Sequence, residues 1–167
     1  MKAYRTMLKT ELKLSLRGMD MLIFAVIMPL VVLVVLGIIY GNKPAFDGAD
    51  YTFIQQSFGA LATIAICAGG VMGLPLVVSD YRSKLILKRF KVTPISPVTI
   101  LLVEVTIYFI YALISLLTLF AVAIIFFSFK MQGSILYFIL GWLLVMVSMF
   151  SIGIMVGGIA KNSKVAG

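Results

Sequence analysis

Few residues in this chain have side chains that could do chemistry, and they do not form a catalytic set. The sequence has no histidine and a single cysteine, Cys67, which rules out a His-ligated metal site and a cysteine cluster. Its six acidic residues are spread over different segments, and no two form a carboxylate pair on one helix face. A G-x-x-x-x-G-K-S/T phosphate-binding loop is missing as well. We therefore expect no enzyme, metal or cofactor here, and any ATP hydrolysis would belong to another chain.

The densest group of charged residues lies between Asp80 and Pro97. Its cations are Arg82, Lys84, Lys88, Arg89 and Lys91. Spacings of four and three residues place three of the lysines on one stripe of a helix, while Leu87 and Phe90 lie three residues apart and can cover an apolar neighbour. Pro94 disfavours helical geometry in the residue before it, so this predicts a short helix over about residues 81–92.

A second helix start follows this group. Ser96 can cap the next helix, with Pro97 in its first turn, where a missing N–H has no cost. Glu104 then lies about seven residues into an apolar stretch, roughly 10 Å along the helix. An acidic residue inside a span is a functional candidate by default. At this depth we favour pairing with basic residues of the preceding loop over a proton or substrate role.

Four apolar stretches must position these residues, and each is long enough to cross a bilayer, which takes about 20 helical residues. They cover about residues 21–40, 57–79, 98–129 and 135–160. The chain is 62% hydrophobic with a mean hydropathy of +1.16, too apolar to present a polar surface to water. Since lipid accepts only helices or closed barrels, we predict an all-α, polytopic integral membrane helical bundle forming one transmembrane domain. Pro29 predicts a kink in the first span.

The net charge of +8 is sorted by position. Twelve of the 14 Lys and Arg residues lie in segments that fall on one side of the membrane, and only Lys43 and Lys130 lie in the other connections. The positive-inside rule then places both termini in the cytoplasm, with the plasma membrane as the expected location. The distribution argues against nucleic acid, since no basic groove with interleaved aromatic residues is present.

Residues 2–17 have the pattern of an interfacial amphipathic helix. One stripe is basic and consists of Lys2, Arg5, Lys9, Lys13 and Arg17. A second stripe is apolar and consists of Tyr4, Leu8, Leu12 and Leu16. Such a helix lies flat on the membrane with its cations toward anionic lipid headgroups. The alternative is a basic flank that only sets the orientation.

Three Gly-xxx-Gly pairs begin at Gly37, Gly69 and Gly153. Small residues let helices approach closely, and we favour packing within one bundle over a dedicated dimer face. Cys67, inside the second span, is expected to be a packing residue.

The order of these parts resembles the permease subunit of an ABC-2 type transporter, the exporter branch of the ATP-binding-cassette superfamily. The most specific similarity is the connection after the second span, Asp80-Tyr81-Arg82-Ser83-Lys84 followed by Leu87-Lys88-Arg89-Phe90-Lys91-Val92-Thr93-Pro94-Ile95-Ser96. The family's glutamate and Gly-Thr step are replaced by Tyr81 and Ser83-Lys84. Further similarities are the basic helix before a proline-containing span and the end of the fourth span, residues 157–166.

The resemblance implies a second permease copy and a separate cytoplasmic ABC ATPase subunit. The helix of about residues 81–92 would be the coupling helix, its cations touching the ATPase or headgroups and Leu87 and Phe90 serving as apolar anchors. The N-terminal helix would support the coupling helix at the membrane surface. The cargo would be a drug, lipid, polysaccharide or peptide. Because such permeases usually have six spans, we expect a truncated chain, with a natural four-span protein as the alternative.

Two other functions remain open at this point. One is a membrane scaffold or assembly protein without transport. The other is a small pore, which should show a polar stripe along a span, whereas the polar residues here look scattered.

Overall fold

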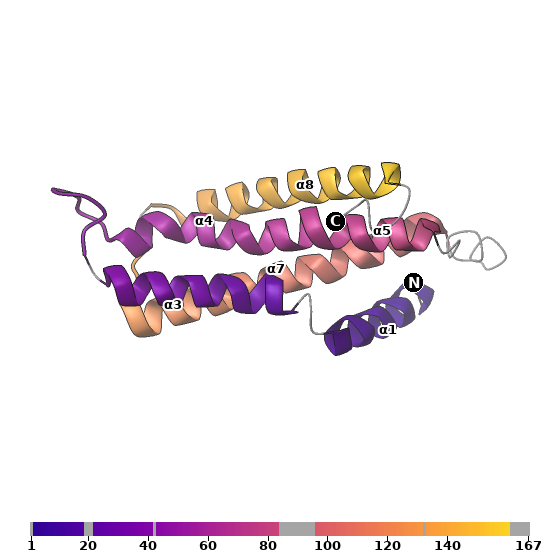
Figure 1. Ribbon diagram of the computed structural model, residues 1–167, viewed down its shortest axis with the longest axis horizontal. Helices are drawn as coiled ribbons and strands as arrows, with labels where there is room; N and C mark the ends of the chain where they lie inside the picture. Colours follow the sequence, from indigo (N-terminus) through magenta and orange to yellow (C-terminus); the bar gives the residue numbers. More distant parts are fainter. Residues whose placement is uncertain (1, 19–21, 42, 84–95, 132, 161–167) are drawn as a thin grey trace.

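The computed structural model describes residues 2–18, 22–41, 43–83, 96–131 and 133–160, and this part of the chain is helical without a β-strand. Its helices are α1 (Lys2–Gly18), η1 (Ile23–Ile27), α3 (Met28–Tyr40), α4 (Phe53–Cys67), η2 (Ala68–Gly73), α5 (Leu74–Ser83), α7 (Pro97–Phe127) and α8 (Ile135–Ile159). Within these described residues, four continuous helices are long and apolar enough to span a membrane, namely Ile23–Tyr40, Phe53–Ser83, Val98–Phe127 and Ile135–Ile159. The predicted all-α membrane bundle is confirmed (Figure 1).

The second of these helices is longer than the 57–79 stretch that hydropathy indicates. It starts at Phe53 because Thr52 forms a capping box with Gln55. The Thr52 side chain accepts a hydrogen bond from the Gln55 N–H at 3.3 Å, and the Gln55 side chain accepts one from the Thr52 N–H at 2.7 Å. The start of this helix is therefore set by polar residues that a hydropathy window does not register.

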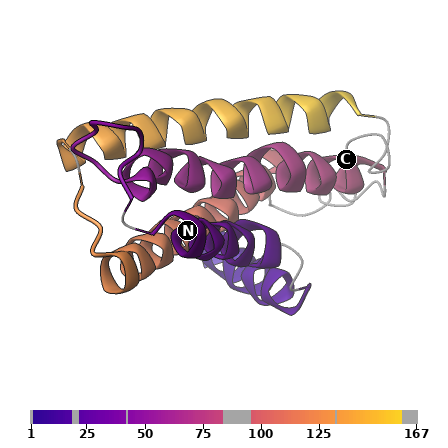
Figure 2. The same ribbon diagram turned by 60° about the vertical axis from the view of Figure 1, so that its left-hand side comes forward.

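The second helix also forms the centre of the bundle. Its most apolar window is 61% buried, against 22%, 33% and 22% for the first, third and fourth helices. In Figures 1 and 2 the α4–α5 helix lies between α8 on one side and α3 with α7 on the other. Movement at the end of this helix would thus reach every other span.

Two spans contain a π-helical segment, and each segment ends two residues before a proline. The Met28 N–H bonds to the Ile23 carbonyl before Pro29, and the Leu74 N–H bonds to the Gly69 carbonyl before Pro75. Proline has no N–H for the usual bond to the carbonyl four residues back, so widening the preceding turn re-pairs the backbone. The irregularity expected at Pro29 is therefore a π-helical turn in the structure.

The glycines pack spans against one another within the bundle, as expected. A Cβ on Gly153 of α8 would collide with the Gly70 carbonyl, and one on Gly157 would lie 3.0 Å from the Pro75 backbone. A Cβ on Gly37 would collide with the Phe127 ring of α7. The fourth span therefore packs closely against the backbone and the Cβ atoms of the second.

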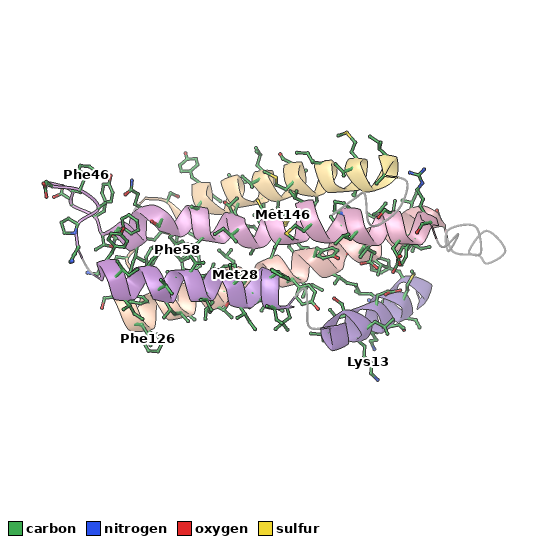
Figure 3. The ribbon with its side chains drawn as sticks, viewed as in Figure 1. Lys13, Met28, Phe46, Phe58, Phe126 and Met146 are labelled. Atoms are coloured by element: carbon green, nitrogen blue, oxygen red, sulfur yellow. The ribbon has the colours of Figure 1, made fainter. Side chains whose placement is uncertain are left out.

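The end of the bundle away from α1 is closed by aromatic rings. Phe58 of α4 is 2% exposed and lies 4.5 Å from the rings of both Phe120 and Phe129. The Phe138 ring lies 6.0 Å from Phe58 and 5.9 Å from Phe120, measured between centroids. This cluster joins α4, α7 and α8 where their connections meet (Figure 3).

Candidate functional site

The candidate site lies at the opposite end, where α5 stops at Ser83 and α7 begins at Pro97. The start of α7 is fixed as predicted, because the Ser96 side chain accepts a hydrogen bond from the Val98 N–H at 3.3 Å. Arg82, in the last turn of α5, is exposed. The remaining predicted coupling residues lie outside the described residues and stay predictions: Lys84, Leu87, Lys88, Arg89, Phe90 and Lys91.

Glu104 links the two helices that flank this segment. Its side chain is 5% exposed, and its Oε1 accepts a hydrogen bond from the Tyr81 hydroxyl at 2.8 Å. Among the described residues the partner of Glu104 is therefore a tyrosine hydroxyl, and the nearby Arg82 is exposed. The basic residues expected to pair with Glu104 otherwise lie outside the described residues, so that pairing stays a prediction. The bond ties the end of the second span to the beginning of the third.

Helix α1 packs beside these two helices through one face (Figures 1 and 2). Its apolar residues Tyr4, Met7, Leu8 and Leu12 pack against the core. The described members of its basic stripe are exposed, and Lys13 points away from the bundle in Figure 3: Arg5, Lys9 and Lys13. The amphipathic pattern is thus present. Leu16 is an exception, since it was expected on the apolar stripe and is 47% exposed.

Polar residues in the packed face of α1 bond to α7. The Tyr4 hydroxyl lies 2.7 Å from Thr106 Oγ1, and Ser15 Oγ lies 2.9 Å from the Tyr111 hydroxyl. Between them, Glu11 lies near enough to Tyr81 and Glu104 to interact with both electrostatically. Helix α1 is therefore bonded to the bundle through its packed face.

Sequence reasoning missed Glu11 and Ser15 as site residues. The signal was present, because Tyr4, Leu8, Glu11 and Ser15 follow one another at spacings of four, three and four, which is one helix face. An interpretation based on hydropathy alone assigned the packed face of this helix mainly to leucine residues. Glu11 and Ser15 lie on this face because they interact with residues of α5 and α7.

Four polar residues of α7 share one buried face. Glu104, Tyr108, Tyr111 and Ser115 are spaced by four, three and four residues and are all at most 5% exposed. They are packed between helices, and Tyr108 also covers Gly69. The stripe serves helix contacts, so it gives no support to an open pore.

Two grooves among the described residues are lined mainly by apolar side chains. One, of about 310 Å³, lies between α5 and α8 and is lined by Val71, Met72, Pro75, Leu76, Ile152, Gly153 and Val156. Another, of about 320 Å³, lies between α4 and α8. Among the described residues, no three His, Cys, Asp or Glu side chains gather as metal ligands.

The described Lys and Arg residues are divided unequally between the two ends of the bundle. The end with α1 carries Arg5, Lys9, Lys13 and Arg82 beside the acidic Glu11, Asp80 and Glu104, and the other end carries Lys43 and Lys130 beside Asp47 and Asp50. Figure 1 shows α1 and the end of α5 at one end of the bundle and the segment that leads into α4 at the other. Which end faces the cytoplasm stays a prediction from the positive-inside rule.

A bundle of four apolar helices with a docked amphipathic helix defines a multi-pass membrane protein. The model of the ABC-2 type transporter family matches residues 2–167, so the chain belongs to the ABC-2 type transporter family and the resemblance is confirmed. The membrane domain of this family is a permease and is not itself an ATPase. Neither the comparison with curated proteins nor that with solved structures gives a match.

Proposed function

We propose that this chain is the permease subunit of an ABC exporter in the plasma membrane, driven by a separate cytoplasmic ATPase subunit and paired with a second permease copy. The cargo class is a drug, lipid, polysaccharide or peptide. Family membership supports a permease role. The observation that carries the proposal is the Tyr81–Glu104 bond, which clamps together the two spans that enter and leave residues 84–95.

This clamp suits a segment that receives force from a partner. If an ATPase subunit displaces the helix predicted over residues 81–92, the displacement reaches α5 and α7 together, because a hydrogen bond inside the bundle joins them. Since α4–α5 is the central span, the movement would spread to α3 and α8. Short rigid elements at domain boundaries transmit closure movements in this way.

The basic residues divide into two proposed groups. Arg82, Lys84, Lys88, Arg89 and Lys91 would bind the ATPase, with Leu87 and Phe90 as anchors. Lys2, Arg5, Lys9, Lys13 and Arg17 would hold α1 at anionic headgroups, with each cation near the surface contributing about 1 kcal/mol. Both groups require the α1 end of the bundle and both termini of this chain to face the cytoplasm.

Co-purification with an ABC ATPase subunit tests this function. The tagged chain is co-expressed with the ATPase encoded beside it and isolated in mild detergent. We expect the two to purify together, and we expect K88E with R89E to abolish the association through charge reversal. The matched control is K43E with K130E, which reverses two cations at the other end and should retain it. Recovery of the ATPase with neither the native chain nor the control would favour the scaffold function instead.

A further inference from the structure

The first and fourth spans differ in length, although they are nearly level at one end of the bundle. They have 18 and 25 residues, which correspond to about 27 Å and about 38 Å of helix. At the end away from α1, the ring of Tyr40 stacks on Phe53 at 4.1 Å, and Phe58 lies 6.0 Å from Phe138 of α8. Both spans therefore reach the same level of the central span there, to within about one helical turn. The difference in length appears at the α1 end.

A chain of contacts fixes the level of α1 along the bundle. Its two hydrogen bonds to α7, at Thr106 and Tyr111, lie on either side of Tyr108. Tyr108 covers Gly69 of the central span, and the carbonyl of the next residue lies against Gly153 of α8. The packed face of α1 is therefore level with Gly153, six residues before the end of α8. Figure 1 shows α1 beside the part of the bundle that α3 leaves uncovered.

From this level onward the two sides of the bundle present opposite surfaces. The α1 side exposes Arg5, Lys9 and Lys13, and Lys13 points away from the bundle in Figure 3. On the α8 side Met155 is 58% exposed and Ile159 is 73% exposed, and the sequence of α8 contains no charged residue. Lipid headgroups attract the cations, whereas exposed apolar side chains are stable in hydrocarbon. A flat lipid surface cannot provide both environments at one height.

Two exposed leucines place α1 at the boundary between headgroups and acyl chains. Leu14 and Leu16 are 54% and 47% exposed on the same helix as the exposed cations. A helix at this boundary keeps its cations among the headgroups while its apolar side chains enter the acyl region. Contact with acyl chains thus accounts for Leu16, which the packed face of α1 leaves outside.

We propose that the α1 side of the bundle binds the phospholipid headgroups of its leaflet nearer to the middle of the membrane than the α8 side does, so that the bilayer is locally thinned at α1. The first span, at about 27 Å, is shorter than a hydrocarbon core of about 30 Å. A bilayer accommodates a short span by thinning, at a modest cost. On the other side α8 continues about 9 Å beyond Gly153. This lipid contact requires only that the bundle spans a membrane, and it is separate from the proposed ATPase contact.

Spin-label accessibility measures the headgroup level on the two sides. The full chain carries Cys67→Ala and one label, at Thr10→Cys on α1 or at Met155→Cys on α8, in vesicles of phosphatidylcholine and phosphatidylglycerol; both positions are exposed. We expect a water-soluble nickel chelate to relax the label on α1, and oxygen, which concentrates in hydrocarbon, to relax the label on α8. If nickel relaxes both labels, α8 extends into water, and if oxygen relaxes both, α1 lies in the hydrocarbon. Either result would overturn the proposal.

Two labels at the opposite end separate local thinning from a tilt of the whole bundle. Ile38 of α3 and Leu136 of α8 are exposed and lie within two residues of the ends of their helices. Thinning on the α1 side leaves labels at Ile38→Cys and Leu136→Cys with similar ratios of nickel to oxygen relaxation. A rigid tilt would move one label into the hydrocarbon and the other out of it, which would contradict the proposal.

Removal of the cations beside Thr10 tests whether they hold the headgroups. In K9Q with K13Q we expect the label at Thr10→Cys to lose its relaxation by nickel and to gain relaxation by oxygen, because the headgroup layer returns to its undisturbed level. The matched control K43Q with K130Q removes two cations from the other end and should leave this label unchanged. If K9Q with K13Q also leaves it unchanged, these cations do not draw the headgroups inward and the proposal is wrong.

Discussion

Gly153→Ala should destabilise the bundle by about 3 kcal/mol, at the upper end of what overpacking usually costs. An added Cβ would occupy the position of the Gly70 carbonyl oxygen, and a backbone group cannot move aside as a flexible side chain does. Gly70 itself lies in η2, whose π-helical geometry is set by Pro75 two residues beyond its end. Relief would therefore require α8 to separate from the central span.

The thermal unfolding of the purified chain in detergent measures this loss. Trp142, the only tryptophan, lies on α8 with its ring 6.4 Å from Phe109, so its fluorescence reports whether α8 is packed. The matched control is Gly158→Ala on the same helix, where an added Cβ meets nothing within 4 Å. That variant should be unchanged or slightly more stable, because alanine favours helix. Equal effects of the two changes would show that Gly153 is not a contact position.

Leu87→Ala combined with Phe90→Ala should lower transport at least about thirtyfold while leaving membrane insertion intact. The proposal makes these side chains the apolar anchors of the ATPase contact, and losing an anchor of this kind costs about 2 kcal/mol or more. ATP hydrolysis by the partner should continue without cargo movement. Co-purification with the ATPase and transport into inverted vesicles are measured on the same preparations.

A second Leu and Phe pair provides the control for that experiment. Leu117 and Phe126 of α7 are 60% and 72% exposed on the lipid-facing surface, and Phe126 points away from the bundle in Figure 3. Their double alanine variant removes the same side-chain types without touching the proposed contact. It should transport normally. Full transport together with unaltered pull-down for Leu87→Ala with Phe90→Ala would remove the coupling role.

The spans were predictable from the sequence because lipid demands long apolar helices, whatever their packing partners. The bounds of the spans were less predictable, since the second helix begins in a polar segment, where Thr52 and Gln55 cap it. The two π-helical turns were not predicted, because hydropathy does not distinguish bonds to the fourth residue from bonds to the fifth. Each turn ends two residues before a proline, Pro29 or Pro75, and these prolines were the available sequence signal.

The candidate site was predictable as a region but not as a set of contacts. Hydropathy and charge placed Glu104 inside the third span and the α1 cations on one helix stripe; in the structure Glu104 is 5% exposed, and the described α1 cations are exposed. The partner of Glu104 depends on which side chains the fold brings near, and Tyr81 lies 23 residues earlier in the chain. Glu11 and Ser15 became part of the packed face for the same reason. Tertiary contacts, and not the local sequence pattern, determined the partner of Glu104 and the place of Glu11 and Ser15 on the packed face.

The central claim is that the end of the bundle formed by α1, α5 and the start of α7 faces the cytoplasm. Cysteine labelling tests it in a chain carrying Cys67→Ala, with Ser83→Cys at this end and Asp47→Cys at the other, both exposed positions. An impermeant maleimide added to intact cells should label the Asp47→Cys variant, and it should label the Ser83→Cys variant only after the membrane is opened. Labelling of Ser83→Cys in intact cells would contradict the topology and, with it, the exporter function.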